Sequence, residues 1–330
     1  MTDKNRRLED IGFYTLSNAR AHNSSATSPL WRAELILTSA CNFRCPYCRG
    51  LREDLRGALS FEQASEIIRL WLAQGLKNVR FSGGEPTIYH RLDELIAMCR
   101  DGGVEHIAIS TNGSASQELY TKLLAAGAND FSVSLDGACC AVGDKMAGVA
   151  GAWPKVVENI RWLAQRTYVT VGMVFTEANV DQCVQAVLFA DSLGAADIRV
   201  IPSAQFNEAL AQLEKLPEEV LNRHPILRYR IANVRNGKHV RGLSETDSRR
   251  CWLALDDMAI AGDFHFPCII YMREGGEPIG RVGPDMREER KRWVSEHDTY
   301  GDAICRGNCL DVCREFNARF EKFHKEEAEE

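Results

Sequence analysis

The chain has 330 residues, of which 45% are hydrophobic and 26% charged, as in ordinary globular proteins. With 46 acidic and 40 basic side chains its net charge is −6, which does not favour nucleic acid or an anionic membrane as a partner. It contains neither an apolar run of the ~20 residues that cross a bilayer nor a recognisable secretion signal, so we expect a cytoplasmic protein.

From residue 32 to 203, short β-branched runs alternate with amphipathic helical stretches. The expected strands are Ala33–Thr38, Asn78–Ser82, His106–Thr111, Asp130–Asp136, Tyr168–Thr176 and Asp197–Pro202. The first intervening helix begins at a capping box, Ser60–Gln63, and ends before Gly75. Strands that alternate with helices predict parallel pairing in an α/β fold, here a partial (β/α)6 TIM-like barrel.

After residue 203 this pattern stops, which divides the chain into five parts. We expect an N-terminal extension (1–31), the barrel (32–203), a helical linker region (204–250), a small α+β domain (251–323) and a charged tail (324–330). Helices are expected over Gln205–Glu214, Pro217–Asn233 and Cys305–Phe323. A hairpin is expected over Trp252–Tyr271, with its turn at Gly262 and Asp263.

Twelve cysteines are many for a chain without an export signal, because a reducing compartment disfavours disulfides. Cys99 and Cys183 lie in helical patterns and are expected to pack in the core. Eight others form two groups, the first being Cys41, Cys45 and Cys48 and the second Cys251, Cys268, Cys305, Cys309 and Cys313. Short regular spacing indicates metal ligation. The first group lacks the fourth local ligand of structural zinc, whereas three thiolates suit a [4Fe–4S] cluster with one open iron.

The first group, with Tyr47 before its third cysteine, resembles the fingerprint of the radical S-adenosylmethionine (SAM) superfamily. Three further strand ends match that family in order: Ser82-Gly83-Gly84-Glu85-Pro86, Ser110-Thr111-Asn112-Gly113 and Ser134-Leu135-Asp136-Gly137. The resemblance implies that the cluster gives one electron to SAM, the C5′–S bond breaks, and a 5′-deoxyadenosyl radical takes hydrogen from the substrate. It further implies SAM contacts from Tyr47, Gly83, Gly84, Glu85, Ser110, Asn112, Ser134, Asp136 and Arg199.

The second group is open to three interpretations: zinc ligation, packing as small hydrophobes, or an iron–sulfur site. Packing fits poorly because Cys305, Cys309 and Cys313 lie among polar residues, and a spacing of four would place them on one helix face. With Gly262 between the first two cysteines, the region resembles SPASM and Twitch domains. Five thiols are too few for the two clusters of SPASM, so the resemblance implies a Twitch-like domain with one auxiliary [4Fe–4S] cluster. Which four cysteines ligate it stays open.

We therefore expect an oxygen-sensitive radical SAM enzyme that oxidises or rearranges a small molecule, such as a sugar, nucleoside or cofactor precursor. A flavodoxin- or ferredoxin-type protein would reduce it. The alternative is a maturase of a ribosomally made peptide, which the short segment before the first strand disfavours. Less favoured is a cluster-bearing binding or electron-transfer protein that does not cleave SAM. The C-terminal Gly-Arg-Arg of the molybdenum-cofactor cyclase is absent, which argues against that particular activity.

A basic segment, residues 223–250, has eight Lys or Arg against two acidic residues. It is either a site for a phosphate, a nucleotide or an acidic peptide, or a solvated helix face followed by a loop. Tyr229 is its only aromatic residue, so base stacking, and with it nucleic-acid binding, is not supported.

Overall fold

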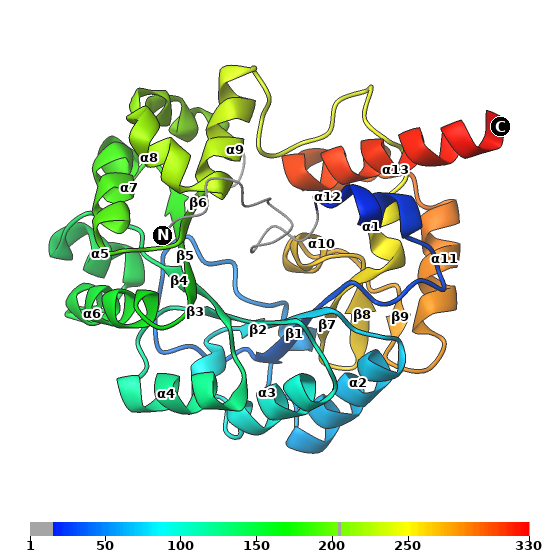
Figure 1. The fold of residues 1–330 in the computed structure, drawn as a ribbon, viewed down its shortest axis with the longest axis horizontal. Coiled ribbons are helices and arrows are strands. Elements are labelled where there is room, and N and C mark those ends of the chain that lie inside the picture. The colour runs from blue at the N-terminus through cyan, green and yellow to red at the C-terminus, as the bar shows by residue number, and fades with distance from the viewer. Residues whose placement is uncertain (1–15, 204–205, 330) are drawn as a thin grey trace.

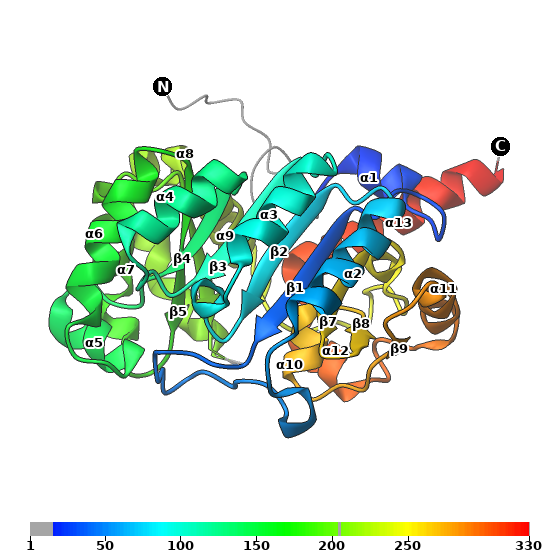
Figure 2. The ribbon, with the colours of Figure 1, turned by 90° about the horizontal axis from the view of Figure 1, so that it is seen from below.

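The computed structural model describes residues 16–203 and 206–329, and its centre is one nine-stranded sheet in the order β6-β5-β4-β3-β2-β1-β7-β8-β9. The six predicted strands are β1 (Arg32–Thr38), β2 (Asn78–Gly83), β3 (His106–Thr111), β4 (Asp130–Ser134), β5 (Tyr168–Phe175) and β6 (Asp197–Pro202). All neighbours among them pair in parallel. The sheet curves around an interior (Figures 1 and 2). Its two edge strands, β6 and β9, do not pair with each other in the described chain, so the barrel is open, which confirms the predicted partial barrel.

Helices cover the outer face of the barrel sheet, as Figure 1 shows. They are α2 (Phe61–Ala73), α3 (Leu92–Asp101), α4 (Gln117–Ala126), α5 (Cys140–Ala147), α6 (Ala152–Ala164) and α7 (Cys183–Ser192), of which α5 was not predicted. The predicted capping box at the start of α2 is confirmed, because the Ser60 hydroxyl accepts from Gln63 N and the Gln63 side chain accepts from Ser60 N. Cys99 and Cys183 are fully buried in this helix-facing core, as predicted.

The barrel strands alternate between apolar residues that face the helices and polar or small residues that face the interior. In β1, Ala33 and Leu35 are fully buried in the core, whereas Arg32 and Glu34 line the interior cavity. The same alternation places Arg80 of β2 inside the barrel. Because successive side chains of a strand point to opposite faces, the core lies between sheet and helices and the barrel interior is left polar.

The predicted hairpin is shorter than expected and belongs to the barrel sheet. β7 (Asp257–Ala261) and β8 (Phe264–Phe266) pair antiparallel across the predicted turn, and β9 (Gly280–Arg281) follows β8. All five residues of β7 are buried, because β7 also pairs in parallel with the free edge of β1. The flanking residues form a 3-10 helix, η6 (Trp252–Leu255), and a short helix, α10 (Ile269–Arg273).

The helix expected over Cys305–Phe323 is wrong, since the chain breaks there. It forms α12 (Ala303–Asn308) and α13 (Asp311–Glu329), and Cys309 between them has extended backbone with ψ 133°. Asp311, the first residue of α13, is buried and forms an ion pair with Arg230. Cys305, Cys309 and Cys313 therefore do not share one helix face.

Two further helix predictions also need correction. Pro217–Asn233 divides into α8 (Glu218–Arg223) and α9 (Pro225–Arg235), because Pro225 has no N–H to continue the first helix. The helix expected over Gln205–Glu214 is a 3-10 helix, η5 (Asn207–Lys215); its first expected residue lies outside the described residues. The remaining helices are α1 (Asn18–Asn23) and α11 (Met286–Glu296).

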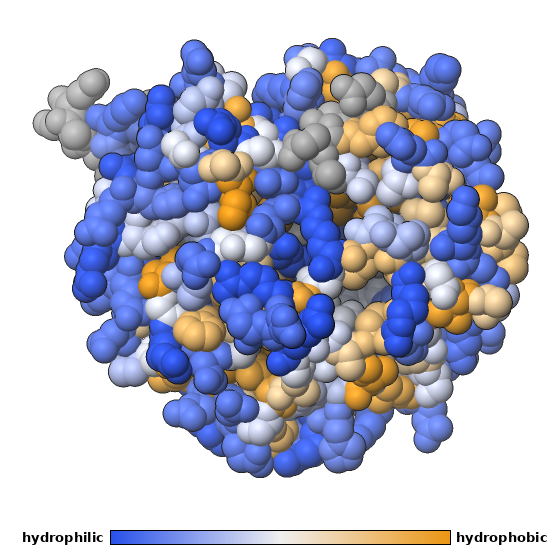
Figure 3. All heavy atoms as spheres, turned by 180° about the vertical axis from the view of Figure 1, so that it is seen from behind, coloured by the Kyte–Doolittle hydropathy of each residue, from blue (hydrophilic) through white to orange (hydrophobic). Residues whose placement is uncertain are grey.

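The molecular surface is mainly hydrophilic on the face opposite that of Figure 1, with apolar residues in scattered groups and a hollow near the centre (Figure 3). None of the helices in the described ranges is long and apolar enough to cross a membrane.

Asp197, the first residue of β6, holds the start of α9. Its fully buried carboxylate accepts from Ile226 N at 3.0 Å and from Ile198 N at 2.8 Å. Burial outweighs these hydrogen bonds and raises the pKa of Asp197 from 3.8 to about 7.

We expect the stability of the metal-free protein to fall as pH rises from 5 to 8, partly through Asp197. Its folded pKa lies above its unfolded value, so the stabilisation is present below pH ~4 and lost as pH rises through about 7. Asp197→Asn, which stays neutral, should flatten the pH dependence of the urea unfolding midpoint. The exposed Asp181→Asn should retain the wild-type slope. Equal slopes for wild type and Asp197→Asn would contradict this assignment.

Candidate functional site

A cavity of about 500 Å³ lies inside the barrel and reaches the carboxyl ends of β1, β2, β3 and β4. Such a volume is typical of small-molecule sites. Eleven of the twelve residues predicted for the first cluster and SAM line it: Cys41, Cys45, Tyr47, Cys48, Gly83, Gly84, Ser110, Asn112, Ser134, Asp136 and Arg199. The topology brings them together because carboxyl ends of parallel strands meet at one edge of a sheet.

The loop after β1 directs its three cysteines into this cavity. Phe43 N lies 3.4 Å from the Cys41 sulfur and Asn112 Nδ2 lies 3.8 Å from it, so N–H groups face that thiol. Cys48 N donates to Cys45 O at 3.1 Å, which forms the turn between these two residues. Cys48 is exposed, whereas Cys41 and Cys45 are half-buried. Three thiols facing one cavity, with no fourth protein sulfur on the loop, fit a [4Fe–4S] cluster with one open iron.

Tyr47 and Asp136 form a hydrogen-bonded pair across the cavity wall. The Tyr47 hydroxyl donates to one Asp136 oxygen, and Val174 N donates to the other at 2.6 Å. Burial raises the pKa of Asp136 to about 6 and keeps the pKa of Tyr47 far above its ordinary value, so the phenol stays protonated. Burial and the nearby Asp136 charge raise the pKa of Cys45 to about 11. The pair fixes the cysteine loop to the end of β4.

Glu85 is the one predicted SAM contact that does not line the cavity. Its carboxylate is fully buried, with one oxygen accepting from Thr87 N and Thr111 Oγ1 and the other from Asn112 N at 2.6 Å. Burial raises its pKa despite these hydrogen bonds. Its hydrogen-bond partners come from Thr87 and from Thr111 and Asn112 at the end of β3. Glu85 is therefore a positioning residue.

The two glycines before Glu85 are required by the chain itself. Gly83 has φ 142°, and a Cβ there would overlap Thr38 O, while a Cβ at Gly84 would overlap Ala40 O. Gly84 N also donates to Thr38 O at 2.7 Å. The glycine turn thus packs directly against the start of the cysteine loop and forms the adjoining cavity wall.

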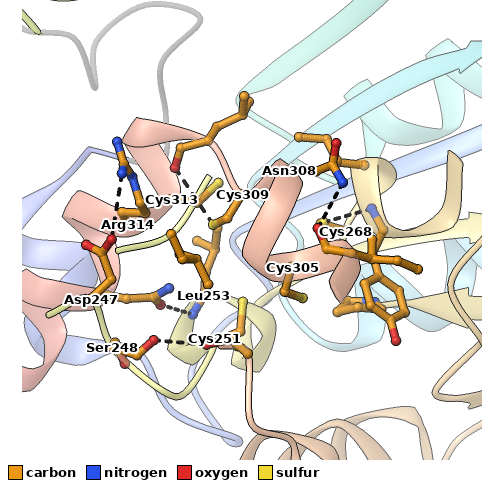
Figure 4. A pocket seen from close by; sticks show the side chains of 18 of the residues that line it. Asp247, Ser248, Cys251, Leu253, Cys268, Cys305, Asn308, Cys309, Cys313 and Arg314 are labelled. Atoms are coloured by element: carbon orange, nitrogen blue, oxygen red, sulfur yellow. Dashed lines mark hydrogen bonds and ion pairs between the residues drawn. The ribbon is translucent and has the colours of Figure 1, made fainter. Parts of the chain in front are cut away.

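A second, smaller cavity of about 50 Å³ is lined by all five C-terminal cysteines. Figure 4 shows their thiols around one space, contributed by residues before η6, at the start of α10, and in and after α12. The two cavities share part of their lining, including Cys268 and Cys313. Burial is the main cause that raises the pKa values of Cys251 and Cys305, and neighbouring thiols add to it. Five convergent thiols match the donor set of an iron–sulfur cluster or of zinc.

One neighbour of this second cavity was missed by the sequence argument. His297 Nε2 lies 3.9 Å from the Cys305 sulfur and 3.6 Å from an Asp302 oxygen, and together the three could hold a metal ion. The imidazole is stacked on Trp293, with ring centroids 4.2 Å apart. His297 lies eight residues before Cys305 in the sequence. This short spacing to a cysteine group is the pattern from which His297 could have been predicted as a further ligand.

Comparisons with known proteins agree with this geometry. The model of the radical SAM superfamily matches residues 35–190. The GTP 3′,8-cyclase of Synechococcus sp. (strain CC9902) is 36% identical over 143 residues, which is 42% of this chain and 41% of the cyclase. The probable GTP 3′,8-cyclase of Metallosphaera sedula is 28% identical over 57% of this chain and 63% of its own length. The chain thus spans 41% and 63% of the lengths of these curated relatives.

Solved structures share the fold over more of the chain. Streptococcus suis SuiB bound to precursor peptide SuiA has a TM-score of 0.59 at 17% identity, covering 86% of this chain and 68% of SuiB. The protein anSMEcpe with bound AdoMet has a TM-score of 0.58 at 14% identity, covering 91% and 94%. The family match and the motif geometry show that the barrel contains a radical SAM domain over residues 35–190, and the solved structures share its fold.

Replacing Gly84 by Ala should damage the site through this packing. The added Cβ cannot avoid Ala40 O without moving the cysteine loop, so we expect SAM affinity of the reconstituted protein to fall ~10-fold or more, measured by calorimetry. Strain of this kind costs about 1–3 kcal/mol in free energy of unfolding. Gly283→Ala, where a Cβ meets nothing within 4 Å, is the control. Wild-type SAM affinity in Gly84→Ala would contradict the role given to this contact.

Proposed function

We propose that this protein is a radical SAM enzyme acting on a small molecule, with Cys41, Cys45 and Cys48 holding the SAM-binding [4Fe–4S] cluster. Cluster and SAM, when bound, supply a 5′-deoxyadenosyl radical that removes hydrogen from the substrate for oxidation or rearrangement. The observation that carries the proposal is the gathering of three thiols, the glycine turn and the ends of β3 and β4 on one cavity.

The chain's own residues orient the reactants. Asn112 connects three motifs: its N–H donates to Glu85, its side-chain amide donates to Asn42 Oδ1 at 2.8 Å, and that amide also faces the Cys41 sulfur. Tyr47 and Asp136 fix the third cysteine against the end of β4. Backbone groups at Gly83 and Gly84, with Ser110, Ser134 and Arg199, are our proposed SAM contacts, since they line the cavity beside the thiols.

We further propose one auxiliary [4Fe–4S] cluster in the second cavity. Support comes from the five thiols around one space and from the lining that Cys268 and Cys313 share with the first cavity. Four thiols suffice for a cubane, and Cys305 is the proposed spare because its sulfur faces His297 and Asp302. A cluster at this place could exchange electrons with the reaction cavity.

The substrate class is supported by relatives named for GTP, a small molecule. A peptide is the second candidate because SuiB, which shares the fold, is seen with its precursor peptide. Cys48 is exposed, which suits delivery of the electron by a flavodoxin- or ferredoxin-type protein. Thiols that ligate iron–sulfur clusters need a reducing compartment, so we propose a cytoplasmic location.

Reductive SAM cleavage is tested by the release of 5′-deoxyadenosine. Wild type, reconstituted anaerobically and reduced with dithionite, should release it, and a Cys41→Ala/Cys45→Ala/Cys48→Ala variant should release none above background. Cys139→Ala, an exposed cysteine outside both cavities, should match wild type. Equal release by the triple variant and wild type would refute the proposed function.

The auxiliary cluster is tested by counting iron and sulfide. Wild type should hold about eight iron atoms and the triple variant about four, as two separate cubanes require. Cys268→Ala/Cys309→Ala should retain about four, and Cys305→Ala about eight if it is the spare ligand. Loss of all iron from the triple variant would show that the second cavity holds no cluster of its own.

A further inference from the structure

The interior of the barrel carries an excess of positive charge, although the whole chain is acidic. Seven arginines but only three carboxylates line the 500 Å³ cavity. Two of those arginines, Arg230 and Arg241, come from the basic segment 223–250. Others of that segment form surface ion pairs, such as Arg223 with Asp191 at 2.6 Å and Arg235 with Glu218 at 3.0 Å. The segment is thus partly a solvated surface and partly cavity wall.

The three carboxylates of the cavity are already engaged by neighbours. Glu34 accepts from the Ser82 hydroxyl at 2.6 Å, and Glu274 forms an ion pair with Arg49. Asp136 is held by Tyr47 and by Val174 N. None of the three forms an ion pair with Arg80 or Arg199.

Arg80 and Arg199 are two cavity cations that form no ion pair with these carboxylates. Within residues 16–203 and 206–329, the side chain of Arg80 makes no ion pair or hydrogen bond, and its Nε is buried. Arg199 donates only to the Ser132 hydroxyl, at 3.0 Å, and its Nε is also buried without a partner in the same residues. Burial, with repulsion from Arg80 and Arg230, lowers the pKa of Arg199 to about 10, although attraction by Glu34 and Asp130 partly opposes this shift. The two guanidinium groups therefore share one interior and repel each other.

A buried guanidinium without a counter-ion is costly, and Arg presents a planar fork that binds carboxylate or phosphate through two hydrogen bonds. SAM has a single carboxylate, and Arg199 is one of its proposed contacts. It can neutralise one guanidinium. Arg80 then remains to bind a second ligand. Arg32, Arg49 and Arg230 of the same lining are paired with carboxylates, and Arg273 and Arg241 donate to the backbone carbonyls of Gly83 and Pro202.

We infer that the barrel interior binds a substrate with at least two anionic oxygen groups, phosphates or carboxylates, and that Arg80 contacts one of them. This inference rests on the proposed function, because it names the substrate class of the same cavity. It favours an anionic small molecule over an uncharged sugar or an apolar peptide segment. Arg80 lies on β2 two residues before Ser82, so its ligand would lie deeper in the barrel than the glycine turn.

The probes for this inference are inorganic tripolyphosphate and citrate, each titrated by calorimetry into the anaerobically reconstituted holoenzyme with saturating SAM. We expect at least one to bind, and Arg80→Gln to weaken it ~10-fold or more, the usual effect of losing a charge-assisted hydrogen bond. Arg80→Lys should be intermediate. The probe that binds more tightly tells a phosphate-bearing substrate from a polycarboxylate. The control is Arg91→Gln, an exposed arginine paired with Glu94 outside the cavity.

Two outcomes would overturn the inference: neither probe binds wild type, or Arg91→Gln weakens binding as much as Arg80→Gln. Release of 5′-deoxyadenosine, measured on the same wild-type preparation, separates this failure from failure of the proposed function. Release without anion binding refutes only the substrate class. Anion binding that depends on Arg80, without any release, refutes the radical chemistry and leaves the anion site standing.

Discussion

The site depends on one strand being paired along both of its edges. β1 pairs with β2 on one side and with β7 on the other, although β2 ends at residue 83 and β7 begins only at residue 257. The first cysteine loop leaves the carboxyl end of β1, and Cys251 and Cys268 of the second group lie just before and after the β7–β8 hairpin. Because backbone pairing fixes both neighbours to the two edges of β1, the two groups of thiols lie around adjoining cavities. The second cysteine region is therefore a continuation of the barrel sheet.

Buried carboxylates hold the first cavity in shape. Glu85 accepts hydrogen bonds from Thr111 and Asn112 at the end of β3, and Asp136 joins Tyr47 to β5. Burial raises the pKa of each carboxyl, which means that ionising them inside the protein is unfavourable. The hydrogen bonds of each carboxylate fix a loop, and that loop presents thiols or backbone groups to the cavity in one geometry. Stability is reduced locally in return for a preorganised site.

The polar interior follows from the pleat of the strands. In Arg32-Ala33-Glu34-Leu35 and in Val79-Arg80-Phe81-Ser82, every second side chain is apolar and faces the helices. The intervening charged and hydroxyl side chains cannot join that core without losing their solvation, so they gather inside the barrel. The interior therefore holds more arginines than carboxylates although the protein is acidic, and this favours negatively charged ligands in the cavity.

The sequence by itself determined the six parallel strands, their order along the chain and the clustering of Cys41, Cys45 and Cys48 with the strand-end motifs, because these depend on local periodicity and on the rule that parallel strands end at one edge. The alternation that reveals Arg80 was also present in the sequence. Only the tertiary structure decided that Glu85 faces its own chain, that β7 joins β1, that Cys309 interrupts a helix, and that His297 approaches Cys305. Each of these four features depends on contacts between segments whose relative placement no local pattern encodes. At these positions, burial and hydrogen bonds from other elements outweigh the local conformational preference.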